Sequence, residues 1–296
     1  MKLQIAGFPI TVLCDHEPLH SYLDRELAAF RTGDGGELIL RIKLAETFDV
    51  LPSDSGEVMR MAPVQGLELW IRHASLGDSL ELKVLVHRSE ECRYSDDEIL
   101  FPLLTNILFS LFLRQLKADK RADVLSIHAC GVIREGRSYL FTGSSGVGKS
   151  TLALQLMGEP WASLQGDDMI PLTRDEAGWV VHASPLGGDI PRQELSNASA
   201  PLAAIFFLSH GSKTVLEPVA AAEAAAMLLE AIVLASSQKN STPVKMSDYE
   251  KGTLMEMMSN AAAMVEAVPC FRLALSLADP NLEEIFKAVD SEVPII

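Results

Sequence analysis

Residues 141–151 read FTGSSGVGKST and have the residue types and spacing of a phosphate-binding loop, GxxxxGK[ST]. In this pattern Gly143 and Gly148 let backbone N–H groups converge on phosphate oxygens. Lys149 neutralises the β- and γ-phosphates, and the Ser150 hydroxyl binds Mg²⁺. The spacing therefore predicts a site for a nucleotide, made by Gly143, Ser144, Ser145, Gly146, Val147, Gly148, Lys149, Ser150 and Thr151.

The segments on either side of this loop have the patterns of a strand and a helix. Residues 138–142, SYLFT, read as a strand, and residues 151–157, TLALQLM, are good helix formers. This order points the N-terminus of the helix at the loop, and the helix dipole then favours an anion there.

Two adjacent carboxylates follow the next predicted strand. The sequence WASLQGDDMIPL places Asp167 and Asp168 at a strand end, where the chain would return beside the loop. One carboxylate there can hold the water shell of Mg²⁺, and the other can orient or deprotonate a hydroxyl. The sequence leaves open which aspartate has which role, and an Asx turn is the ordinary structural alternative.

His128 ends the strand LSIH shortly before the loop strand. A histidine in this position is either a hydrogen-bonded core residue or a titratable group of the site. The residues alone leave both interpretations open.

Composition excludes several classes of partner. The 296 residues carry a formal net charge of −15, with 40 acidic and 25 basic residues. Binding to nucleic acid or to an anionic membrane surface depends largely on Lys and Arg, so we expect neither. Any anionic ligand must be held by a local site.

Cysteine usage and apolar stretches predict a cytoplasmic protein. The cysteines are far apart and form no CxxC pair, which is typical of thiols in a reducing compartment. Pro9 interrupts the apolar N-terminus, which reads as a strand and not as a signal peptide. Polar residues also interrupt the apolar stretches 99–116 and 220–235, which we interpret as core helices.

The chain divides by pattern into two predicted domains. Residues 1–118 show strands at 37–45, 66–74 and 79–88, a helix near 19–30, a turn signal at 52–56 and a final helix at 96–117 that bridges to the second domain. Residues 119–296 alternate short apolar strands with helices, which predicts an α/β core. The polar stretch 236–243, SSQKNSTP, is predicted to be an exposed loop between two helices.

The succession LSIHACGV, SYLFTGSSGVGKSTLALQL and LQGDDMIPL resembles the HPr kinase/phosphorylase family and its smaller kinase relatives. These proteins share an ATP core with ATP-dependent phosphoenolpyruvate carboxykinase. The resemblance covers about residues 122–175 firmly and continues more weakly through SPLGGDIPR, PLAAIFFL and FRLALSL. It implies a P-loop α/β core of the HPr-kinase type with an N-terminal extension. The strand and helix pattern of residues 1–118 predicts that this extension is a smaller α+β domain.

The resemblance also implies roles for single residues. The loop would hold ATP, and Ser150 with Asp167 or Asp168 would bind Mg²⁺, while the other aspartate serves the acceptor hydroxyl. His128 matches the histidine that precedes the P-loop strand in the family. Arg192, in SPLGGDIPRQ, lies where an arginine could clamp phosphate, although arginine is also a common way to solvate a loop.

Together these patterns predict a cytoplasmic ATP-dependent kinase of the EC 2.7 class. Its acceptor would be a serine-type hydroxyl on a protein, a peptide or a small molecule. The chain lacks the glycine- and asparagine-containing stretch with which true HPr kinases contact HPr, so the acceptor stays open, as does a homo-oligomeric state. Two alternatives are an ATP-binding regulator or scaffold without transfer activity and a simple NTPase; the aspartate pair favours the kinase.

Overall fold

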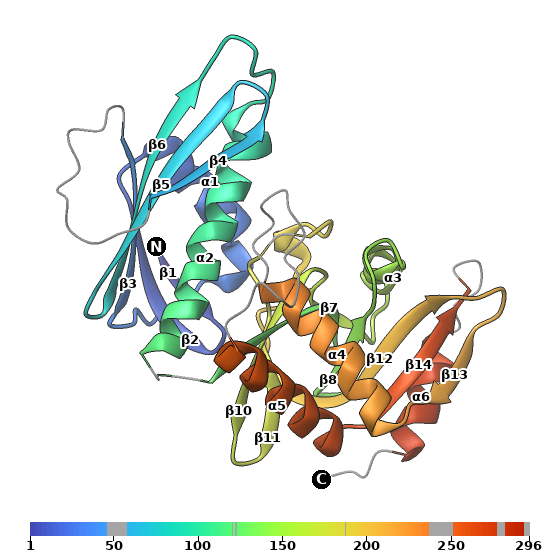
Figure 1. The fold of residues 1–296 in the computed structure, drawn as a ribbon. Helices are drawn as coiled ribbons and strands as arrows, with labels where there is room; N and C mark the ends of the chain where they lie inside the picture. Colours follow the sequence, from blue (N-terminus) through green and yellow to red (C-terminus); the bar gives the residue numbers. More distant parts are fainter. Residues whose placement is uncertain are drawn as a thin grey trace. The chain divides into compact units, whose positions relative to one another are not determined.

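The computed structural model describes residues 1–45, 58–119, 121, 123–186, 188–236, 251–276 and 282–292. The protein is a mixed α/β protein with two mixed sheets (Figure 1). It divides into two compact units, Met1–Ala122 and Asp123–Ile296, and the sequence placed this boundary between residues 118 and 119. The predicted turn at 52–56 and all but the first residue of the predicted loop at 236–243 lie outside the described residues.

The first unit contains a six-stranded sheet with the order β1-β2-β3-β6-β5-β4. The pairings β2–β3 and β3–β6 are parallel, and the others are antiparallel. In β6 alternate residues are buried, because successive side chains of a strand point to opposite faces. The strands are β1 (Lys2–Ile5), β2 (Phe8–Cys14), β3 (Leu38–Ala45), β4 (Val58–Val64), β5 (Leu67–Leu76) and β6 (Ser79–Arg88).

Helices α1 (Glu17–Glu26) and α2 (Phe101–Ala118) belong to the same unit, together with the short turn η1 (Ala28–Phe30). A π-helical turn, η2 (Asp96–Leu100), leads into α2, and a capping box between Ser95 and Glu98 begins it. The stretch Asp96–Ala118 is the one described helix that is long and apolar enough to cross a membrane. It contacts α1, β3 and β6 and buries many of its apolar side chains, as a core helix does.

The second unit contains an eight-stranded sheet (Figure 1). Its strand order is β11-β10-β7-β8-β12-β14-β13, β9 pairs with β7, and β11 also pairs with β12, so five of the strands close into a ring. The strands β8, β12 and β14 are parallel. The strands are β7 (Val124–Arg134), β8 (Arg137–Thr142), β9 (Ser163–Gly166), β10 (Met169–Asp175), β11 (Gly178–Val181), β12 (Ala200–His210), β13 (Val215–Pro218) and β14 (Cys270–Leu275).

Helices cover both faces of this sheet. Leu140 on β8 belongs to the core cluster that α4 and α5 complete, whereas the neighbouring Tyr139 and Phe141 contact Phe286 of α6, with ring centroids 4.8 Å and 5.9 Å apart. Adjacent residues of a strand face opposite sides of the sheet. Helices α4 and α5 therefore cover one face, and α6 covers the other. The helices of the unit are α3 (Lys149–Leu156), α4 (Ala221–Ser236), α5 (Lys251–Ala267) and α6 (Leu282–Glu292), with the short turn η3 (Arg192–Glu194).

His182, just after β11, is a buried polar residue of this core. Its side chain lies within hydrogen-bonding distance of two hydroxyls, Nε2 at 2.8 Å from Thr173 Oγ1 and Nδ1 at 2.7 Å from Ser199 Oγ. A neutral imidazole has one donor and one acceptor nitrogen, so both contacts are satisfied without a charge. Burial lowers the pKa of His182 from 6.5 to about 4.

This shift predicts a loss of stability in mild acid. Between pH 6.5 and about 4 the unfolded chain binds a proton at His182 that the folded protein does not bind, so the free energy of unfolding falls as the pH falls. The loss is on the order of 3 kcal/mol over this window. Denaturant titrations at several pH values should show a flatter profile for His182→Gln. The exposed His210, changed to Gln, is the control, and equal slopes for wild type and His182→Gln would contradict the prediction.

Candidate functional site

Loop 143–148 connects the end of β8 to the first residue of α3. Gly146 and Gly148 have φ angles of 80° and 103°, in the left-handed region that favours glycine. The Val147 N–H donates to the Ser144 carbonyl over 3.3 Å. The glycines therefore allow a backbone turn that other residues would strain.

Helix α3 turns its N-terminus towards this loop. The first four N–H groups of a helix have no carbonyl partner within it, and the first helical bond here runs from Leu152 N–H to the Gly148 carbonyl over 2.9 Å. No side chain caps this end. The free N–H groups and the helix dipole together favour an anion at this point.

Lys149, the first residue of α3, is a buried cation with 6% exposure. Its Nζ donates to the carbonyls of Gly143 at 2.9 Å and Ser144 at 3.1 Å. Burial lowers the pKa of Lys149, and the nearby Asp168 carboxylate opposes this shift. Two carbonyl groups of loop 143–148 thus fix the position of the Lys149 ammonium group.

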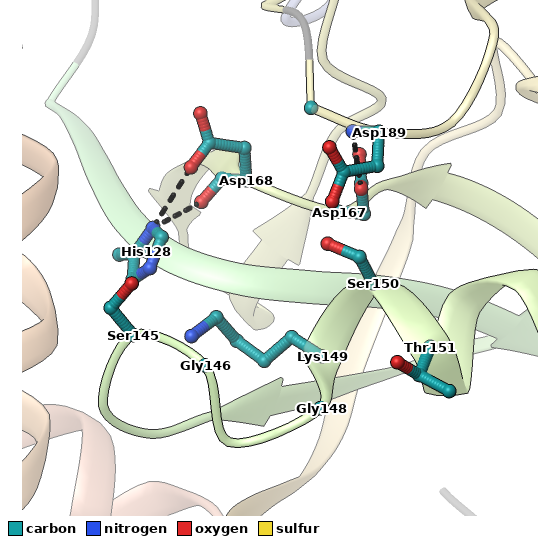
Figure 2. Close-up of a pocket in the computed structure, with 11 residues that line it drawn as sticks. His128, Ser145, Gly146, Gly148, Lys149, Ser150, Thr151, Asp167, Asp168 and Asp189 are labelled. Atoms are coloured by element: carbon teal, nitrogen blue, oxygen red, sulfur yellow. Dashed lines mark hydrogen bonds and ion pairs between the residues drawn. The ribbon is translucent and has the colours of Figure 1, made fainter.

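The two aspartates lie in the connection between β9 and β10 and have different partners (Figure 2). Asp167 is 4% exposed, and its Oδ2 accepts the N–H of Asp189 at 2.8 Å. Burial raises the pKa of Asp167, whereas hydrogen bonds from Asp189 N–H and the Ser150 side chain lower it. Asp167 therefore faces the hydroxyl at the start of α3.

Asp168 instead faces His128 on β7 (Figure 2). His128 Nδ1 lies 3.1 Å from Asp168 Oδ1 and 3.0 Å from the Asp168 carbonyl oxygen. Both oxygens are acceptors, so this geometry favours a proton on Nδ1, which leaves Nε2 as the acceptor nitrogen of a neutral ring. The structure thus separates the aspartates into one that contacts Ser150 and one that contacts His128.

Strand β7 brings these groups to one place. It pairs with β8 and with β10, so that Ala129 lies opposite Thr142 and His128 lies opposite Met169. The loop follows Thr142 directly, and Asp168 precedes Met169 directly. Two neighbouring residues of β7 therefore set the separation between the glycine loop and the aspartates.

The resulting pocket has a volume of about 430 Å³. Most of the predicted site residues line it, and every lining residue is polar, charged or glycine. Gly143, Ser144, Val147 and Arg192 are not among the lining residues. The lining residues are His128, Ser145, Gly146, Gly148, Lys149, Ser150, Thr151, Asp167, Asp168, Gly188 and Asp189.

Arg192 does not line this pocket, so its role as a phosphate clamp stays a prediction. It lies in η3 and is 7% exposed, and its Nε donates to the Pro185 carbonyl over 2.7 Å. The guanidinium group thus bonds to its own loop.

Gly188 and Asp189 were not predicted as site residues. They belong to the stretch SPLGGDIPR, in which only Arg192 was singled out. The glycine pair before an aspartate was the available signal, because glycine often marks a close approach of the backbone to another group.

The residues of the pocket can supply ligands for Mg²⁺. Within the described ranges there is no group of three or more His, Cys, Asp or Glu side chains that could enclose a metal. Mg²⁺ commonly uses only one or two carboxylates together with waters and phosphate oxygens. The buried Asp167 and the hydroxyl of Ser150 fit such a partial set of ligands.

The hydrogen bonds of His128 predict its tautomer. The neutral ring should carry its proton on Nδ1, because both acceptors of Asp168 lie there. Two-bond ¹H–¹⁵N NMR correlations of the imidazole would identify the protonated nitrogen, with the exposed His210 as reference. A neutral ring protonated on Nε2 would contradict the geometry.

Comparison with known proteins places the chain in a family. No curated protein matches it. Among solved structures, the HPr(Ser) kinase/phosphatase from Coxiella burnetii is 14% identical, with 45% of this chain and 86% of that chain covered and a TM-score of 0.25. A likeness at this score supports no inference, so the resemblance to HPr kinases stays a prediction. The sequence model of ScmC, described as SynChlorMet cassette protein ScmC, matches residues 93–290. This match covers more than half of the 296 residues and includes every residue that lines the pocket, so the chain belongs to the ScmC family.

Proposed function

We propose that this protein is an ATP-dependent kinase that transfers the γ-phosphate of Mg-ATP to a hydroxyl-bearing acceptor. One observation carries the proposal. A single pocket is lined by a cationic loop at a helix N-terminus and by two aspartates, of which Asp167 contacts Ser150 and Asp168 contacts His128. Phosphoryl transfer requires little covalent chemistry from the protein and depends on positioning and charge stabilisation. The loop with Lys149 would supply the charge stabilisation, and the two aspartates would supply the positioning.

The phosphate groups would lie against loop 143–148 and the start of α3. The N–H groups there have no intrahelical partner, and Lys149 is the lysine that lines the pocket. Because Lys149 is buried, its charge is weakly screened by water and interacts strongly with an anion. Its present bonds to two carbonyls can be exchanged for bonds to phosphate oxygens.

Asp167 and Ser150 would hold Mg²⁺. Bound Mg²⁺ supplies positive charge to the phosphate oxygens during transfer. Asp167 has the hydrogen bond with the Ser150 side chain that places carboxylate and hydroxyl together at the helix start. This assigns the metal to Asp167 and leaves Asp168 for the acceptor.

Asp168 and His128 would act on the acceptor hydroxyl as an acid–base pair. Asp168 would accept a hydrogen bond from Nδ1–H of His128, so that Nε2 can accept the proton that the hydroxyl loses. The same relation of carboxylate, imidazole and hydroxyl activates nucleophiles in other enzymes. The acceptor would be a serine-type hydroxyl of a protein, a peptide or a small molecule.

We further infer a cytoplasmic location. All four cysteines are free thiols, as in proteins of reducing compartments. The net charge of −15 opposes binding to nucleic acid and anionic membranes.

Removal of the buried cation should weaken nucleotide binding. Lys149→Ala should raise the Kd for Mg-ADP by about tenfold to a hundredfold, because a charge-assisted hydrogen bond contributes about 1.5–3 kcal/mol. Isothermal titration calorimetry measures this directly. The exposed Lys213, changed to Ala, is the matched control and should bind like wild type. Unchanged binding by Lys149→Ala would contradict the phosphate-binding role of the loop.

Changes to the acid–base pair should separate transfer from binding. Asp168→Asn and His128→Gln should each lower phosphate transfer by about 10²-fold or more, the usual contribution of a positioned acid or base, with Mg-ADP affinity within about threefold of wild type. Transfer is measured with γ-labelled ATP against a cell lysate and a panel of serine peptides. Controls are Asp175→Asn and His210→Gln, which change exposed residues of the same unit.

Either of two results would reject this assignment. The first is wild-type transfer in both variants. The second is tight Mg-ATP binding by the wild-type protein with no transfer to any acceptor, which would favour an ATP-binding regulator.

A further inference from the structure

We propose that Gly188 and the backbone N–H of Asp189 position the Asp167 carboxylate, and that residue 188 must lack a side chain for this reason. The inference rests on the proposed function, in which Asp167 holds Mg²⁺. It makes Gly188 and Asp189 positioning residues, because they act through Asp167.

The first observation is the space around Gly188. A Cβ atom at this residue would lie 2.0 Å from Asp167 Oδ1, 2.4 Å from Cγ and 2.6 Å from Oδ2. Real Cβ atoms essentially never approach another heavy atom within 3.0 Å. All three nearest atoms belong to Asp167, so its carboxylate occupies the volume that a side chain at residue 188 would need.

The second observation is the hydrogen bond beside this contact. The Asp189 N–H donates to Asp167 Oδ2 over 2.8 Å (Figure 2). A buried carboxylate needs such donors, because an unsatisfied charge in the interior costs several kcal/mol. The carboxylate is therefore in contact with the 188–189 backbone on one side and has its hydrogen bond with Ser150 at the helix start.

The two observations together describe an outer support for a metal ligand. Groups that hydrogen-bond a ligand fix its orientation, and their loss typically lowers metal affinity by about 10–100-fold. An added methyl group at residue 188 would push the carboxylate away from the Asp189 N–H and from Ser150. The three atoms nearest to the methyl group all belong to Asp167, so we expect the effect on loop 143–148 to be small.

The role assigned to Asp189 belongs to its backbone and not to its side chain. Asp189→Ala keeps the N–H donor and removes the carboxylate. This variant therefore separates support of Asp167 from direct binding of a metal by Asp189.

The test compares metal and nucleotide affinities of the full chain. We expect Gly188→Ala to weaken binding of Mg²⁺ to the ADP complex by about tenfold or more, and to leave metal-free ADP affinity within about threefold of wild type. Calorimetry measures both affinities, and electron paramagnetic resonance of Mn²⁺ with ADP reports the metal environment. The control is Gly158→Ala, because a Cβ at Gly158 has no atom within 4 Å. Asp189→Ala should weaken Mg²⁺ binding clearly less than Gly188→Ala does, because it keeps the N–H donor to Asp167.

A double-mutant cycle shows whether the effect passes through Asp167. In an Asp167→Ala background the three clashing atoms are gone, so adding Gly188→Ala should change neither melting temperature nor Mg²⁺ affinity further. If Gly188→Ala alone fails to fold, recovery of folding in the double variant supports the proposal, and failure of the double variant overturns it.

Three results would overturn the positioning role. The first is a Gly188→Ala variant that binds Mg²⁺ like wild type. The second is an equal effect of Gly188→Ala on Mg²⁺ affinity and melting temperature with and without Asp167. The third is a loss of Mg²⁺ affinity in Asp189→Ala as large as that in Gly188→Ala. Absence of Mg²⁺-dependent ADP binding in wild type would refute the proposed function instead. In that case the positioning role would be judged from the melting temperatures of the double-mutant cycle. It is supported if Gly188→Ala lowers the melting temperature only when Asp167 is present, and it is overturned if the effects of the two substitutions simply add.

Discussion

The pairing of β7 with β8 on one side and with β10 on the other is the constraint on which the site depends. The N–H of Ala129 donates to the Asp168 carbonyl over 3.0 Å, and the Thr142 hydroxyl donates to the His128 carbonyl over 2.8 Å. These bonds hold the ends of two strands at one edge of the sheet. The glycine loop follows the last residue of β8, and the two aspartates directly precede the first residue of β10. A change in register by one residue would turn His128 to the opposite face, because side chains alternate along a strand.

The site gathers charges that the surrounding core disfavours. Burial lowers the pKa of Lys149 and raises the pKa of Asp167, so both groups shift towards their neutral forms. Perturbed groups of this kind are enriched at functional sites, although buried structural residues such as His182 show them as well. The cost is offset by the apolar layers on both faces of the sheet, where Phe141 and Phe206 stack at 4.7 Å and α4 and α5 complete the core cluster.

Much of the fold follows from local patterns. The predicted strands at 37–45, 66–74 and 79–88 correspond to β3, β5 and β6, and the predicted helix at 96–117 corresponds to η2 with α2. Strands β4, β10 and β13 were not predicted, because each contains proline, which usually marks a strand edge or a break. Pro171 nevertheless lies in β10 opposite Ser126 of β7. Pairing with neighbouring strands overrides the local preference at that position.

The order of strand, glycine loop and helix, and the aspartate pair after the next strand, could be predicted from the sequence, because these features depend on residues close together in the chain. The different partners of the two aspartates are visible only in the folded chain, where Asp167 faces Ser150 and Asp189 while Asp168 faces His128. The same holds for the bond of Arg192 to its own loop and for the contact of Gly188 with Asp167. The contacts of Asp167, Asp168 and Gly188 join residues about 17 to 40 apart in the chain, and long-range strand pairing and burial set them, which local propensity does not encode. The bond of Arg192 to Pro185 spans only 7 residues, but burial of this loop sets it.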